Sequence, residues 1–197
     1  MPKNTDVRVG APDQKVPGAI THAPVGTALP DLTDITKAAV TLNQAFTGDE
    51  YVSDDGLTLS PSRSTTEIKD WSGSTVRKVL ESFDGTLSWT MISTNEGALS
   101  IAFGADHVTT AAATTAHGAQ VKAALGAYLP EEQAWVFLMK DGDARIVIAV
   151  PDGQITEVGE VTFASNAAVG WNVTLSCYPD AAGNSIYIMT DDGVVTA

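Results

Sequence analysis

An alternation of apolar and polar residues, with a period of two, recurs along most of the chain and predicts β-strands. A hairpin is predicted from two short apolar runs: Trp135 to Met139, in which Trp135, Phe137 and Met139 alternate with Val136 and Leu138, and a return strand at Ile146 to Val150 after the turn Lys140 to Asp143. The predicted strands are 57–60, one that begins near 76, 87–91, 135–139, 146–150, 155–163, 171–177 and 185–189. The pattern therefore predicts a mainly β protein.

One short α-helix is predicted to dock on these strands. Asn95 followed by Glu96 is a favourable helix start, and Gly104 is placed to end the helix as a C-terminal glycine. Residues 31–46 also have apolar residues at a roughly helical spacing, but β-branched Thr and Val dilute this signal. We therefore expect an extended or short-helical segment there, laid along a neighbour.

A long polar stretch at about 60–75 separates two of the predicted strands. Pro61 has no N–H to donate, so we expect it to end the first strand, and Asp84-Gly85 predicts a tight turn further on. This reading makes 60–75 a long inter-strand loop with an aromatic residue in it. An aromatic side chain in a polar loop needs a partner surface, and a neighbouring subunit would provide one. The candidates for inter-subunit contact are Glu67, Lys69, Asp70, Trp71 and Arg77.

The first 35 residues contain five prolines and no sustained periodicity. These features are typical of an arm or loop. We predict an extended N-terminal arm over residues 1–40 and a β domain over residues 41–197. The segment Thr109 to Gly118 is rich in Ala and Thr and is expected to be an exposed loop.

The formal net charge of −13 argues against a protein that grips nucleic acid, because such binding depends on Lys and Arg at the phosphates. Solubility and a functional role both remain open as explanations of this charge. No apolar run is long enough to cross a membrane, and the N-terminus shows no secretory signal. Cys177 is the single cysteine and is expected to be a small core residue.

Catalytic and metal-binding motifs are not recognised in the chain. The three histidines, His22, His107 and His117, have no partners at zinc-site spacing, and the Asp-Gly segments lack the ligand pattern of an EF-hand, so we interpret them as turns. We therefore predict no catalytic residue, metal or cofactor. Trp89, Trp135 and Trp171 lie in alternating strands and are predicted to belong to the core.

The order of short motifs along the chain resembles the major tail protein, or tail tube protein, of siphophages. The resemblance covers about residues 10 to 185 and depends on order and spacing. The residues that carry it are Asp55-Gly56, Glu67, Trp71-Ser72-Gly73, Val76-Arg77, Asn95-Glu96 and Phe103-Gly104, followed by Val173-Thr174-Leu175, Pro179-Asp180 and Gly183.

This resemblance implies a structural virion protein and not an enzyme. Its fold would be a β-sandwich or barrel of the phage tail tube type, with one docked α-helix, an N-terminal arm and a long inter-strand loop. Subunits would close into hexameric rings that stack into the tail tube, through which DNA passes during ejection without being bound. The implied partners are the protein itself, a tape measure protein, and tail terminator and tail tip proteins, with no membrane. The implied location is the virion tail, assembled in the host bacterial cytoplasm.

The channel wall is predicted from two adjacent strands that each have an apolar and a polar face. The predicted lumen-facing residues are Glu160, Thr162, Asn172 and Thr174. Glu157 falls on the core-facing side of this pattern unless a bulge at Gly159 re-aims it. A polar, acidic wall would repel DNA and let it slide.

A different class of function is kept as the alternative: a carbohydrate-binding β-sandwich on a virion or secreted protein. It predicts a monomer with exposed aromatic side chains on one face.

Overall fold

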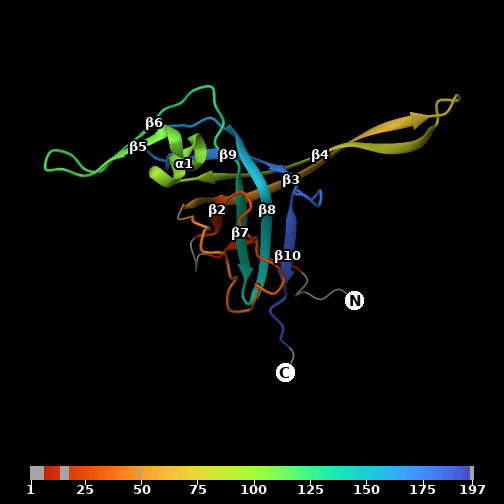
Figure 1. Cartoon of the computed structure of the whole chain (residues 1–197), viewed down its shortest axis with the longest axis horizontal. Helices are drawn as coiled ribbons and strands as arrows, with labels where there is room; N and C mark the ends of the chain where they lie inside the picture. The colour runs from red at the N-terminus through yellow and green to blue at the C-terminus, as the bar shows by residue number, and fades with distance from the viewer. Residues whose placement is uncertain (1–6, 14–17, 49, 196–197) are drawn as a thin grey trace.

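The computed structural model of the chain describes residues 7–13, 18–48 and 50–195. Within them, strands far outnumber helices (Figure 1). The elements are β1 (Ala11–Pro12), β2 (Ile20–Pro24), β3 (Val52–Lys69), β4 (Thr75–Met91), α1 (Glu96–Phe103), a 3-10 turn (Ala105–His107), β5 (Val108–Ala111), β6 (Gln120–Ala123), β7 (Gln133–Asp141), β8 (Ala144–Val158), β9 (Trp171–Tyr178) and β10 (Tyr187–Asp191). The predicted mainly β fold with one short helix is confirmed.

Strand β8 joins two halves of a single antiparallel sheet. Its first half pairs with β7 and β10, and its second half, from Asp152 onward, pairs with β9. The sheet then continues from β9 to β4 and to β3, which is an edge strand. We call the β8 end, β9, β4 and β3 the second half-sheet. Since β8 contributes to both halves, its path determines how they are placed around the core.

The core lies between these two half-sheets. Trp89 from β4 packs against Trp135 and Phe137 from β7, with ring centroids 5.5 and 5.4 Å apart. Helix α1 closes one end of this core with Ala98, Ile101 and Ala102. A second apolar cluster covers the other face of β7 and β8, where Ile35, Val40 and Phe46 from the N-terminal segment are buried. The first half-sheet is therefore covered on both faces.

The predicted loop at 60–75 is wrong, because β3 and β4 continue through it as a hairpin. Pro61 pairs with Gly85 inside this hairpin, and only residues 70–74 form the turn. Proline is tolerated there because β3 is an edge strand. Asp84-Gly85 is not a turn either. A Cβ on Gly85 would lie 2.6 Å from Cδ1 of Ile186, so close packing is what favours glycine in this strand.

Other boundaries differ in the second half of the chain. The strand predicted at 146–150 continues through residues 151–153 into the one predicted at 155–163, and this single strand, β8, ends at Val158. The last strand is shifted by two residues, to 187–191.

Helix α1 is confirmed, with the Asn95 side chain accepting a hydrogen bond from the Ala98 N–H and Gly104 at φ 85°. Residues 31–46 form no helix and contain one β-bridge, from Ile35 to Val40. The predicted loop at 109–118 begins in β5, and β6 follows it as the second strand of a short ribbon.

The N-terminal segment is partly built into the sheet. Strand β2 pairs with β7 from Ile20↔Phe137 to Pro24↔Gln133. Asp13 is buried and lies 3.3 Å from Arg145, whose guanidinium also donates a hydrogen bond to the Lys37 carbonyl. These contacts attach the described part of the predicted arm to the β7–β8 hairpin.

Candidate assembly surfaces

The outer half of the β3–β4 hairpin projects from the body as a two-stranded ribbon (Figure 1). Strand β9 accompanies β4 only from Gly85 to Met91, so residues 62–84 lie beyond the rest of the sheet. Six large apolar side chains on the hairpin are exposed: Ile68, Trp71, Val76, Val79, Leu80 and Phe83. An isolated two-stranded ribbon is at best marginally stable in water. This length and exposure are therefore the features of a segment that packs against another surface.

The hairpin ends in a tight, internally bonded turn. The Asp70 carboxylate accepts hydrogen bonds from the side chain and N–H of Ser72 and from the N–H of Ser74. These bonds, first of all the one from the Ser72 hydroxyl, lower the pKa of Asp70 below its usual value. Gly73 has φ 87°, which favours glycine. The turn holds Trp71 fully in solvent, with a relative exposure of 105%.

The five residues predicted for inter-subunit contact are brought together at this tip. Glu67 forms an ion pair with Lys78 at 3.0 Å, and Lys69 and Arg77 stand beside the turn in the paired strands. The prediction did not include the exposed apolar residues Val79, Leu80 and Phe83. Their signal was the group of apolar residues between Val76 and the assumed turn at Asp84-Gly85, which the prediction did not treat as exposed.

The second half-sheet has a hydroxyl-rich outer face. Along β4, Leu87, Trp89 and Met91 point into the core, and the residues between them point outward. Cross-strand hydrogen bonds join the outward side chains, from Asn172 to Thr90 at 3.0 Å and between Thr156 and Ser176 at 2.8 Å. From the strand registers and the Thr156–Ser176 hydrogen bond, the face comprises Thr58, Ser60, Thr86, Ser88, Thr90, Asn172, Thr174, Ser176, Gln154, Thr156 and Glu157. We call this surface the hydroxyl face.

A family comparison matches residues 6–197 to the family described as "Phage tail tube protein". This match spans almost the whole chain. The chain belongs to the phage tail tube protein family. It is therefore a structural component of a phage tail, located in the tail of the virion, where it assembles with other tail proteins.

Comparison with solved structures finds a similar chain described as the "anti-feeding prophage cap (AFP tube terminating cap)". The two chains share 12% sequence identity, the match covers 94% of each, and the TM-score is 0.46. Comparison with curated proteins gave no match.

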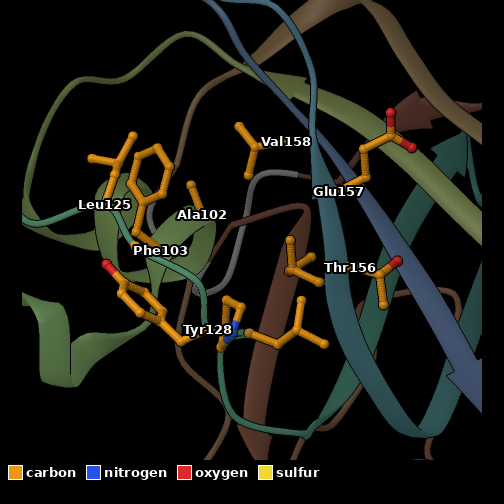
Figure 2. A pocket seen from close by; sticks show the side chains of 11 residues that line it. Ala102, Phe103, Leu125, Tyr128, Thr156, Glu157 and Val158 are labelled. Carbon is orange, nitrogen blue, oxygen red and sulfur yellow. The ribbon is translucent and has the colours of Figure 1, made fainter.

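A β-bulge determines which acidic residue of this tail protein lies on the hydroxyl face. The register of β8 and β9 shifts between Ile155 and Glu157, so Glu157 lies opposite Thr174. Figure 2 shows Thr156 and Glu157 on one side of β8 and Val158 on the helix side. The prediction that Glu157 faces the core is wrong, because the extra residue is Thr156 and no bulge at Gly159 is needed.

The four predicted lumen residues separate into two groups. Asn172 and Thr174 lie on the hydroxyl face of β9. Glu160 and Thr162 lie in the coil between β8 and β9, because β8 ends at Val158. They are not members of the strand face from which the prediction was argued. The sequence carries one sign of the bulge, because the consecutive polar residues Thr156 and Glu157 interrupt the alternation, but the prediction continued the period of two through them.

The three tryptophans of the strands and His22 are packed into the body of the tail protein. Trp89 and Trp135 are buried, and Trp171 is partly buried and packs edge-on against Phe103. Burial, partly offset by a hydrogen bond to Gln133, lowers the pKa of His22. In the described ranges, no group of three or more His, Cys, Asp or Glu side chains is placed to hold a metal ion, and no helix is long and apolar enough to cross a membrane.

Proposed function

We propose that this tail protein polymerises as stacked hexameric rings into the tail tube of a long-tailed phage and forms the conduit for DNA ejection. The observation that carries the proposal is the second half-sheet with its two open edges. In the described residues, β3 is paired only with β4, and the end of β8 beyond Gly153 is paired only with β9. Open sheet edges favour pairing with another chain, and ring closure removes them.

Closure of six such half-sheets would make one barrel. Each subunit contributes four strands to it, namely the end of β8, β9, β4 and β3. With a strand spacing of about 4.8 Å and a tilt of about 40°, 24 strands give a backbone diameter of about 50 Å. Barrels with fewer strands than this already enclose an aqueous channel. The folded-over sheet would then serve as the β-sandwich wall of the tube.

The hydroxyl face suits the lumen of this barrel. It is opposite to the core and bears hydroxyl and amide groups, with Glu157 as a carboxylate and with no Lys or Arg among its members. Because a basic wall would bind phosphates through counterion release, a neutral to acidic wall lets DNA pass. Asn172, Thr174 and Glu157 are therefore the lumen residues of the proposal.

Ring stacking would use the β3–β4 hairpin with Glu67, Lys69, Asp70, Trp71 and Arg77. Exposed apolar residues of the N-terminal segment, Val7 and Val9, suit a second stacking contact. The proposed partners beyond the chain itself are a tape measure protein and the tail terminator and tip proteins, and assembly would take place in the host cytoplasm. The sequence motifs resemble those of siphophages, as described above.

Negative-stain microscopy of the purified protein tests the proposed function. Concentrated protein is expected to form rings and tubes of uniform diameter whose end views show six-fold symmetry. A protein that stays monomeric at all concentrations and in the presence of tail initiator proteins would refute it.

Replacing Glu157 with lysine in an infectious phage tests the lumen assignment. Tubes are expected to assemble, since the side chain is exposed, while DNA ejection slows. The net charge of a six-subunit ring would change by about +12, because six carboxylates are lost and six ammonium groups are gained, and each ammonium group can hold a phosphate. The delay, measured as the rate of DNA release, should grow as salt is lowered, because screening weakens.

Glu160→Lys is the matched control, with the same charge change in the coil after β8. It is expected to slow ejection much less. Equal delays in both variants, or a delay in Glu160→Lys alone, would show that the hydroxyl face does not line the channel.

A further inference from the structure

A large apolar groove lies at the root of the β3–β4 hairpin. Its volume is about 1010 Å³, and it runs between the start of β3 and the strands β1, β2 and β7. The apolar residues that line it include Tyr51, Val52, Leu57, Ile92, Phe137 and Met139. Tyr51 and Ile92 are exposed, at 69% and 40%. The groove is therefore an open apolar site with room for more than one large side chain.

The groove and the hairpin tip lie at opposite ends of the same strand. Residues 52–57 of β3 line the groove, and β3 ends at Lys69, directly before the turn that holds Trp71. At a rise of about 3.3 Å per residue, about 40 Å separates Leu57 from Lys69. The tip therefore cannot fold back into the groove of its own chain. A groove at one end of a subunit and a segment that fits it at the other end can form a heterologous, head-to-tail contact between subunits.

The chemistry of the tip matches that of the groove. The tip presents Trp71, Ile68 and Val76 as exposed apolar side chains, which suit an apolar groove. Lys69 and Arg77 flank Trp71 and form no ion pair with the described residues. The exposed acidic side chain of Asp54 lines the groove, whereas the carboxylate of Glu50 lies against Gly97 with one oxygen buried. A basic, aromatic tip and an acidic, apolar groove are complementary in both charge and polarity.

We propose that the groove is the receptor for the β3–β4 hairpin tip of a second copy of this chain, with Trp71 as the buried anchor. Lys69 and Arg77 then approach Asp54 at the rim. This inference rests on the proposed function, since it names the partner surface of the same assembly contact. It also determines the direction of assembly, because every subunit offers one tip and one groove. Successive subunits are therefore joined without limit along the tube.

Site-directed cross-linking tests the tip-to-groove contact. Ser72→Cys places a thiol next to Trp71, and Ser53→Cys places one in the groove lining. The native Cys177 does not compete, because burial raises the pKa of its thiol to about 12. Assembled double variant, treated with a short bifunctional maleimide, is expected to give a ladder of covalent multimers. A mixture of the two single variants is expected to give dimers only, because each chain then carries one thiol of the pair.

The matched control pairs Ser72→Cys with Thr110→Cys on the exposed strand β5, and it is expected to give no ladder. If tubes form but the Ser72–Ser53 pair cross-links no more than this control, the groove has another occupant and the inference is wrong, while the proposed function stands. If the wild-type protein forms neither rings nor tubes, the proposed function fails and the inference fails with it.

A double-mutant cycle provides a second measurement that needs no cysteine. Trp71→Ala and Tyr51→Ala are each expected to raise the critical concentration for assembly about tenfold or more. Both changes remove the same contact. The critical concentration of the double variant should therefore rise clearly less than the product of the two single-variant increases. Full multiplicative loss would show two independent contacts and would overturn the assignment of Trp71 to the groove.

Discussion

Replacing Trp71 with alanine is expected to weaken tube formation strongly, with a critical concentration raised about tenfold or more, and to leave the folded subunit intact. The side chain is fully exposed, so its removal creates no cavity and should shift the melting temperature of the monomer by no more than a few degrees. Truncating an aromatic anchor at an interface costs about 2 kcal/mol or more, which corresponds to about 30-fold weaker association. Because every subunit makes this contact in a tube, the loss recurs along the whole assembly.

The measurements are pelleting or light scattering for assembly, and thermal unfolding of the dilute subunit for stability. Phe163→Ala is the matched control, since Phe163 is also an exposed aromatic residue, at 74%, but lies in the coil between β8 and β9. It is expected to assemble like wild type. Normal tubes from Trp71→Ala would remove the hairpin tip from the assembly contact.

Replacing Trp89 with alanine is expected to have the opposite effect. Trp89 is 2% exposed and packs against Trp135 and Phe137 at the centre of the core. Removing a large buried aromatic side chain costs about 3 to 5 kcal/mol, because packing is lost and a cavity remains. For a chain of this size, the melting temperature should fall by about 6 to 20 °C.

Urea unfolding of the subunit measures this loss directly, and Trp71→Ala serves as the surface counterpart with the same change in composition. A free energy of unfolding that falls by less than about 1 kcal/mol in Trp89→Ala would contradict the placement of the core between the two half-sheets. Together, the two tryptophan variants separate the stability of the subunit from its capacity to assemble.

Local signals in the sequence were sufficient wherever a residue type has one dominant use. Asn95 and Gly104 define the ends of α1 because a side-chain cap and a positive φ each favour few residue types. Short apolar runs located β7 and the first half of β8, which are buried on both faces, and alternation located β9, which is buried on one face. The resemblance of the motif order to tail tube proteins, which the family match confirms, also required no structure.

The errors arose where a local signal has two physical explanations. Pro61 and Asp84-Gly85 are typical of a strand end and a turn, but an edge strand tolerates proline and the packing of Ile186 favours a glycine. Both facts depend on residues distant in sequence. For the same reason, the lack of alternation in residues 60–75 predicted a polar loop with one aromatic residue. The chain instead forms a hairpin with six exposed apolar side chains.

The sequence by itself determined the strand-rich composition, the single capped helix and the aromatic residue at the tip of a polar segment. Only the tertiary structure decided the direction of Glu157, because a bulge at Thr156 is a matter of register between β8 and β9. It alone also decided that the tip and the groove lie at opposite ends of β3. The physical reason is that alternation reports which residues avoid water within one strand, whereas register, edges and grooves depend on which strands are neighbours.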